Sequence, residues 1–212
     1  MSARHFRPTS AVLLAATLVG WSFAGPRLPA SWRVLLQAGM GGALVLVTRA
    51  PLGLGPPRLW AGLRLGSAAA FSAASTVAAT TLLAPVRQSM AVREPPATVP
   101  DWLLVRIPLG TVWPEESAFR AALAIVGTAA FGRHGGRLLQ ATAFGLSHIP
   151  DARATGEPVA ATVLVTGIGG WLFGWLADRS GSLAAPMLAH LAINEAGAIA
   201  VLAARSPNRW GR

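Results

Sequence analysis

Two adjacent glutamates and an arginine stand between apolar runs in segment 114–120, which reads PEESAFR. Proline followed by acids is typical of a helix start, because proline suits the first helical position and negative charge suits the dipole's positive end. At α-helical spacing Glu116 and Arg120 share a face and can form a structural ion pair, whereas Glu115 points about 100° away. A carboxylate at membrane depth costs roughly 2.5 kcal/mol or more and is by default a functional-site hypothesis. The alternative is a helix end whose acids are solvated at the water interface.

Two histidines and an asparagine are the other polar side chains that can take part in chemistry. His148 closes one apolar segment, and His190 and Asn194 lie four residues apart on one face of the last segment. A single histidine in an apolar helix is usually a packing residue, and a nearby asparagine often bonds one helix to another. The spacing of all three groups together favours a shared site. His5 and His134 lie in polar segments and are interpreted as solvated.

The elements that must position these residues are apolar segments of helical length. We predict seven helices, at 11–24, 34–47, 65–83, 114–131, 137–148, 159–177 and 183–204. Segment 102–113 is too short to span a membrane, which takes roughly 20 residues, and leads into the helix at Pro114. Breakers predict a polar linker at 85–100, a turn at 132–136 and a stop at 149–151. With no internal repeat and no strand alternation, the predicted fold is an all-α polytopic transmembrane bundle.

The order of these helices predicts how the polar groups meet. Segments 114–131 and 137–148 should pack antiparallel, which returns Glu115 and His148 to the same side of the membrane. The helix at 159–177 then carries the chain to the far side. At 1.5 Å per residue His190 would lie about 10 Å deep and Asn194 about 16 Å. The three groups can therefore converge at mid-depth.

Small residues predict where helices approach one another closely. The second helix carries Gly39, Gly41 and Gly42, and the sixth carries Gly170 and Gly174 in a GxxxG arrangement. Both patterns are typical of packing faces between membrane helices.

Composition supports an integral membrane protein. Hydrophobic residues make up 53% of the 212 and charged residues only 12%. All 18 basic residues are arginine, which with abundant Ala, Gly and Pro suggests a bacterial cell membrane. The net charge of +10 is scattered between apolar runs, which argues against a nucleic-acid partner. The first apolar segment resembles a signal peptide, but similar segments recur, so it is interpreted as a retained membrane helix.

Three ordered motifs resemble those of the CAAX-protease and bacteriocin-processing (CPBP/Abi) family of intramembrane proteases. They read EExxFR at 115–120, FGLSH at 144–148 and PxxxHxxxN at 186–194. The resemblance implies a catalytic core at 101–204, preceded by N-terminal transmembrane helices at 1–100 and followed by a polar tail at 205–212. Ala121 stands where many members carry glycine.

By this resemblance the protein is a membrane-embedded peptidase acting on a membrane-associated peptide or protein in the lipid bilayer. Glu115 would be the general base, His148 would orient and polarise a water, and His190 with Asn194 would stabilise the oxyanion. The peptidase can be of the glutamate type or metal-dependent. Glu115, His148 and His190 could also form a zinc site, although the chain has no cysteine and no HExxH motif. The metal-free glutamate mechanism, with no cofactor, is favoured.

Two other functional classes fit some of the same residues. A proton-coupled transporter also uses carboxylates and histidines inside a bundle, but it commonly carries an inverted repeat. A non-catalytic immunity or scaffold protein can use the same fold without turnover. The scaffold hypothesis predicts indifference to substitution of Glu115.

Overall fold

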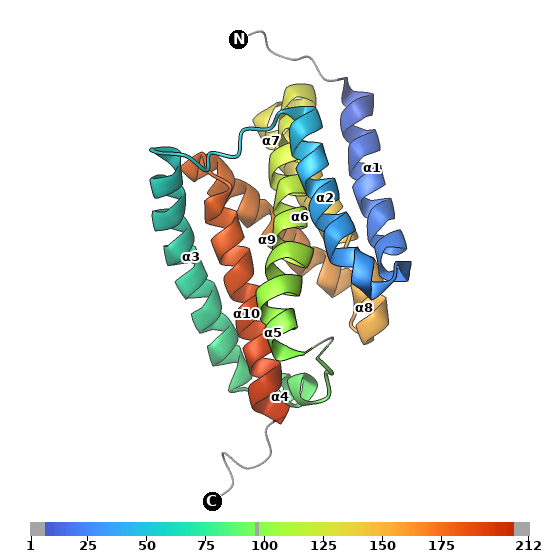
Figure 1. Cartoon of the computed structure of the whole chain (residues 1–212), viewed down its shortest axis with the longest axis vertical. Coiled ribbons are helices and arrows are strands. Elements are labelled where there is room, and N and C mark those ends of the chain that lie inside the picture. The colour runs from blue at the N-terminus through green and yellow to red at the C-terminus, as the bar shows by residue number, and fades with distance from the viewer. Residues whose placement is uncertain (1–6, 96–97, 206–212) are drawn as a thin grey trace, which may run out of the picture.

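The computed structural model describes residues 7–95 and 98–205, and this part of the chain is a bundle of helices without strands (Figure 1). Seven long helical segments confirm the predicted all-α architecture. The first three are α1 (Pro8–Ala24), α2 (Ala30–Thr48) and α3 (Arg58–Thr81). The interpretation of His5 as solvated and the predicted tail beyond Arg205 lie outside the described residues.

The predicted linker at 85–100 is partly helical. Helix α4 (Ala84–Ala91) follows α3 at a bend of 94°. Pro85 lies in the first turn of α4, where a proline's missing N–H is not needed for an intrahelical bond. The linker prediction was therefore wrong for its first half.

The helix that carries the two glutamates begins well before Pro114, contrary to the prediction. It runs through α5 (Val99–Asp101), η2 (Trp102–Arg106), η3 (Pro108–Val112), α6 (Trp113–Glu115) and η4 (Glu116–Leu123) into α7 (Ala124–Leu146). The η segments are π-helical, and the N–H groups of Ile107 and Trp113 each bond to a carbonyl five residues back. A proline ring clashes with the carbonyl four residues back in an α-helix. The wider π turns accommodate Pro108 and Pro114 in a continuous helical path, so the helix does not begin or break at Pro114.

The turn and the stop predicted around α7 are both shorter than expected. Gly132, with φ 74° and ψ 174°, is the one non-helical residue inside α7, and the chain is helical again from Arg133. After α7 ends, His148 leads directly into α8 (Ile149–Thr155), whose first turn contains Pro150. Proline at the start of a helix explains why 149–151 begins a new helix instead of a loop.

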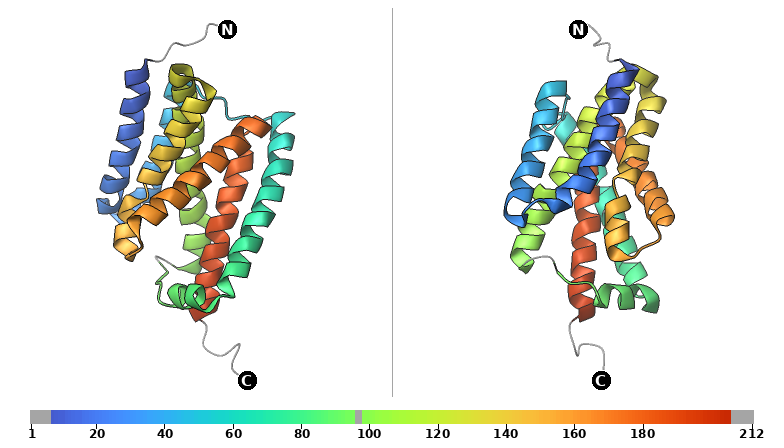
Figure 2. Two further views of the ribbon diagram at one scale, coloured as in Figure 1. Left: turned by 180° about the vertical axis from the view of Figure 1, so that it is seen from behind. Right: turned by 90° about the vertical axis from the view of Figure 1, so that its right-hand side faces the viewer.

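Two long helices complete the bundle, α9 (Val159–Ser180) and α10 (Ala184–Arg205). Helix α3 runs along α10 on one side of the bundle, while α1 and α2 lie on the other side of the α6 path (Figure 1). Seen from behind, α9 crosses the bundle obliquely and packs on α7 (Figure 2). The N-terminal helices are thus packed directly on the elements that carry the motifs.

Two glycines permit close helix contacts around the glutamates. A Cβ atom at Gly41 of α2 would lie 3.0 Å from the Pro114 Cα atom, and one at Gly170 of α9 would lie 2.9 Å from the Phe144 ring. Both predicted packing faces are therefore used. Gly39 and Gly42 have nothing within 4 Å of such a Cβ, so only Gly41 of its run is needed for close approach.

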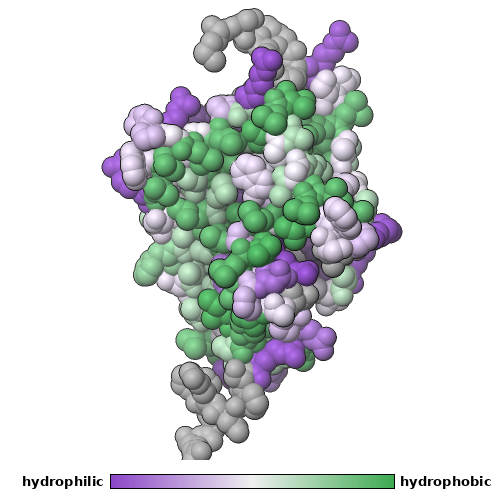
Figure 3. Space-filling model, in the orientation of Figure 1, coloured by the Kyte–Doolittle hydropathy of each residue, from purple (hydrophilic) through white to green (hydrophobic). Residues whose placement is uncertain are grey.

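The surface suits a membrane. Four helices are long and apolar enough to cross one, Pro8–Arg27, Ser31–Thr48, Val159–Ser180 and Ala184–Arg205, and the bent α3–α4 pair can supply a fifth. Hydrophobic residues dominate the face in Figure 3, and hydrophilic ones gather toward its upper and lower parts. The bundle is that of an integral membrane protein.

Candidate functional site

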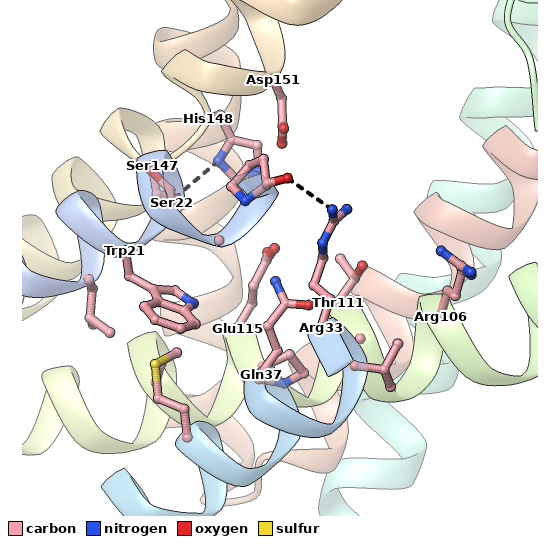
Figure 4. Close-up of a pocket in the computed structure, with 18 of the residues that line it drawn as sticks. Trp21, Ser22, Arg33, Gln37, Arg106, Thr111, Glu115, Ser147, His148 and Asp151 are labelled. Atoms are coloured by element: carbon pink, nitrogen blue, oxygen red, sulfur yellow. Dashed lines mark hydrogen bonds between the residues drawn. The ribbon is translucent and has the colours of Figure 1, made fainter. Parts of the chain in front are cut away.

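A cavity of about 330 Å³ lies where α1, α2, the α5–α6 path and the end of α7 meet (Figure 4). Glu115 and His148 both line it, although they come from helices separated by the Gly132 break. The other labelled polar residues around it are Trp21, Ser22, Arg33, Gln37, Arg106, Thr111, Ser147 and Asp151. The antiparallel arrangement of the two helices thus brings Glu115 of the first motif and His148 of the second to one site.

Glu115 is the motif carboxylate that faces this cavity. Its side chain is 29% exposed, but its Oε2 atom is buried and has no hydrogen-bond partner within 7–95 and 98–205. This oxygen lies 3.8 Å from Nε2 of His190, which is beyond direct hydrogen-bonding distance. Buried carboxylate oxygens are normally paired, so one without a protein donor is suited to hold a water or a substrate group.

Glu116 is held quite differently, in a fully buried cluster with Arg120 and His190. His190 Nδ1–H donates to Glu116 Oε1 at 2.8 Å, and the same oxygen lies 3.4 Å from Arg120 Nη1. An ionised carboxylate can only accept, so this contact assigns the His190 proton to Nδ1 and directs Nε2 toward Glu115. Glu116 therefore has two partners, the predicted Arg120 and a histidine from α10.

Aromatic rings surround the buried arginine. The Arg120 guanidinium carbon lies 3.8 Å from the Phe144 ring centroid and 5.0 Å from that of Phe173. Phe173 also stacks on His190, with 5.2 Å between ring centroids. The ring faces attract the cation and their packing holds the cluster rigid.

His148 is the last residue before α8 and is partly buried. Its Nδ1–H donates to the carbonyl of Phe144 at 2.7 Å, one turn back along α7. The Phe144 ring meets the His148 ring edge-on, with centroids 4.7 Å apart. This orientation leaves Nε2 as the acceptor nitrogen of a neutral imidazole.

Asn194 lies one turn beyond His190 on α10 and does not line the cavity. Its Nδ2 donates to the His190 carbonyl at 3.1 Å. His190 does not line the cavity either, but it lies 3.8 Å from Glu115 and its ring centroid is 6.2 Å from that of Phe144, whereas Asn194 lies one turn farther along α10.

Comparison with known proteins agrees with these motifs. Residues 98–196 match the family model described as type II CAAX prenyl endopeptidase Rce1-like. This segment is thus similar to that family and carries all three motifs. No curated protein and no solved structure matched the chain. All the predicted site residues fall inside the matched segment, and the similarity supports an intramembrane endopeptidase.

The predicted zinc site of Glu115, His148 and His190 needs all three ligands close to one point. Carboxylate oxygen and imidazole nitrogen are suitable zinc ligands. In the part of the chain that the structure describes, no three histidine or acidic side chains lie close enough together to hold a metal ion. Nδ1 of His190 is occupied by Glu116. The residues as placed do not form a ligand set.

Sequence reasoning missed the part of the site that lies outside the matched segment 98–196. Arg33 and Gln37, on α2, line the cavity beside Glu115 (Figure 4). The signal for them was present, because they are four residues apart on an otherwise apolar helix and so share one face. The rule applied to the charges of 114–120, that polar groups at membrane depth mark function, applies equally here.

Proposed function

We propose that this protein hydrolyses a peptide bond of a membrane-associated peptide with a water that Glu115 activates. The observation that carries the proposal is the environment of Glu115, which lines the same cavity as His148 and whose buried Oε2, 3.8 Å from His190 Nε2, has no hydrogen-bond donor among the described residues. A general base needs a free lone pair within reach of the proton that it removes.

In the first step the Glu115 carboxylate takes a proton from water as the water oxygen attacks the scissile carbonyl carbon. The carbonyl oxygen becomes the oxyanion of a tetrahedral intermediate. His148, whose Nδ1 is bonded to the Phe144 carbonyl, orients the water through Nε2. Protonated Glu115 then returns the proton to the leaving amine as the C–N bond breaks.

His190 and Asn194 are proposed to stabilise the oxyanion. Glu116 orients His190 through Nδ1–H, and Nε2, on the side of Glu115, donates when the ring carries a second proton there. Asn194, outside the cavity lining, uses one of its two amide hydrogens on the His190 carbonyl and has a second to donate. Donors oriented in advance stabilise developing charge without reorganisation.

Product analysis by mass spectrometry tests this function. Purified protein in lipid nanodiscs is incubated with a mixture of N-terminally acylated, randomised peptides, and new C-termini are sequenced. We expect defined cleavage products from the unmodified protein and none from Glu115→Gln. The matched control is Glu94→Gln, at an exposed glutamate far from the cavity lining, which should cleave normally. Equal products from Glu115→Gln would overturn the assignment of the base, and their absence from every protein would favour the scaffold hypothesis.

A further inference from the structure

The last turn of α9 carries a cluster of arginines with a single acid among them. Arg133 and Arg137, which follow the Gly132 break in α7, both lie against Asp178 near the end of α9, and Arg179 is the next residue along the chain. The three arginines and Asp178 are here called the basic corner. None of them lines the cavity described above, so the proposed reaction leaves this cluster without a role.

Asp178 balances only one of the three positive charges. Its Oδ2 atom pairs with Nη2 of the buried Arg137 and lies 3.5 Å from Nε of Arg133. Nε of Arg137 is buried without a partner among the described residues, so Asp178 does not saturate even that guanidinium. Arg133 is 65% exposed, and Arg179 is exposed without a hydrogen bond or ion pair to any residue in 7–95 and 98–205. Three positive charges against one negative charge leave a surplus of two.

The face of α9 that leads to the basic corner is apolar. Four exposed side chains on it recur every three or four residues and so share one face, namely Leu164, Ile168, Trp171 and Trp175. At 1.5 Å per residue this row is about 17 Å long, roughly half the thickness of the hydrocarbon core of a bilayer. Figure 2 shows α9 on the outside of the bundle when it is seen from behind. The Trp171 ring lies 5.3 Å from the Arg137 guanidinium carbon, so apolar row and charged cluster meet at a tryptophan, a residue typical of the membrane interface.

We propose that the basic corner binds the phosphate of an anionic phospholipid whose acyl chains lie along the apolar row of α9. Arginines at the end of a lipid-facing apolar row match both parts of a phospholipid at once. A zwitterionic lipid would bring an ammonium group of its own, and the one acid of the cluster is already paired with Arg137. The surplus of two positive charges therefore favours a headgroup with a net negative charge, such as phosphatidylglycerol. This inference goes beyond the proposed hydrolysis and does not depend on it.

Lipid titrations followed by native mass spectrometry test the proposal. The purified chain in detergent is titrated with dioleoyl phosphatidylglycerol or with dioleoyl phosphatidylcholine, and the dissociation constant of the first bound lipid is measured for each. We expect phosphatidylglycerol to bind about 10–30-fold more tightly, since each arginine near an anionic headgroup contributes about 5-fold in affinity. Excess inorganic phosphate should not displace it, because the acyl chains add binding that a free ion lacks. Displacement by phosphate would indicate a site for a soluble anion and overturn the proposal.

A double substitution assigns this preference to the basic corner. Arg133→Gln with Arg179→Gln removes the surplus charge and keeps the buried ion pair, so the two affinities should then agree to within about 2-fold. The matched control is Arg27→Gln with Arg153→Gln, which removes the same charge from exposed arginines of η1 and α8 and should keep the full preference. Equal binding of both lipids by the unmodified chain, a preference that survives the first double variant, or an equal loss in the control would overturn the proposal.

Asp178→Asn should move the preference the other way. It removes the carboxylate that competes with the lipid for the arginines, so phosphatidylglycerol should bind about 5-fold more tightly and phosphatidylcholine about as before. A purely structural role for Asp178 predicts no such gain, because loss of an ion pair only lowers stability. An unchanged or weaker preference in the folded variant would contradict binding by surplus charge.

Discussion

Glu115 and Glu116 are neighbours with the same side chain, and the fold gives them opposite environments. Glu116 is completely buried, and one of its oxygens meets both His190 and Arg120. Each glutamate has a buried Oε2 without a donor among the described residues, but Glu115 is partly exposed and lines the cavity, whereas Glu116 does not. Glu116 is placed to hold helices together, and Glu115 is the one proposed to react.

The difference shows how one pair of carboxylates separates structure from chemistry. A buried charge is tolerated when it is paired and hydrogen-bonded, as Glu116 is through its Oε1 atom. A general base must instead keep a lone pair available. His190 connects the two roles, because its Nδ1 bonds to Glu116 while its Nε2 lies 3.8 Å from Glu115.

The largest expected effect comes from replacing each of the two glutamates with glutamine in separate variants. Glu115→Gln should lower kcat by at least about 10²–10⁴-fold with an unchanged thermal midpoint, because an amide cannot accept the water's proton. Glu116→Gln should instead lower the thermal midpoint, since it leaves the buried Arg120 cation without its counter-charge. Initial rates and thermal unfolding of both variants give the comparison. If both variants lost the same property, the division of roles would be wrong.

Arg120→Ala tests the buried side of the comparison. Removing one partner of a buried pair leaves an uncompensated charge, so we expect a loss of roughly 3–5 kcal/mol in the free energy of unfolding. Adding Glu116→Gln should restore much of it, and denaturant unfolding of the single and double variants measures the recovery. A double variant no more stable than Arg120→Ala would count against the pairing.

Substitution of Asn194 tests how the reaction proposed for Glu115 is assisted. If it donates to the oxyanion, Asn194→Ala should lower kcat by about 10²–10³-fold while KM changes little. If it instead supports a zinc site, its loss should weaken metal affinity by about 10–100-fold. Kinetics together with elemental analysis separate these outcomes.

The same proteins test metal dependence directly. We predict that active preparations contain no stoichiometric zinc and that exhaustive chelation leaves the rate unchanged. The glutamate mechanism would be wrong if the protein held one zinc per chain, if chelation removed both zinc and activity, and if added zinc restored both. The mechanism would then be metal-dependent.

The smallest effect is expected where α2 approaches the glutamates. Gly41→Ala would place a Cβ atom 3.0 Å from the Pro114 backbone, and overpacking of this kind costs about 1–3 kcal/mol. Gly42→Ala, one residue away and with nothing within 4 Å, should be neutral or stabilise by up to about 1 kcal/mol. The thermal midpoints of the two variants measure this difference in stability. Gly41→Ala should also lose activity, because the added methyl group pushes α2 away from Glu115, whereas Gly42→Ala should keep its activity.

Local patterns in the sequence predicted most of the fold. Apolar segments of helical length located the long helices, because each such segment must satisfy its own backbone hydrogen bonds in a membrane. The same patterns failed where Pro114 was interpreted as the start of a helix. Pro108 and Pro114 lie within a continuous helical path, since π turns relieve the clash that an α turn would create.

The sequence by itself determined the long helices and indicated the residues that are proposed to react, because residue type and helical period are local properties. The tertiary structure alone decided how those residues divide their roles. Glu116 meets His190 across 74 positions of chain, and it does so because α10 packs beside η4 with Phe173 and Phe144 filling the space around Arg120. The position of Arg33 and Gln37 on the cavity beside Glu115 depends equally on packing, since α2 lies so close to Pro114 that a Cβ atom at Gly41 would be 3.0 Å from its Cα. Contacts between distant segments depend on how side chains fill space, which no single helix specifies.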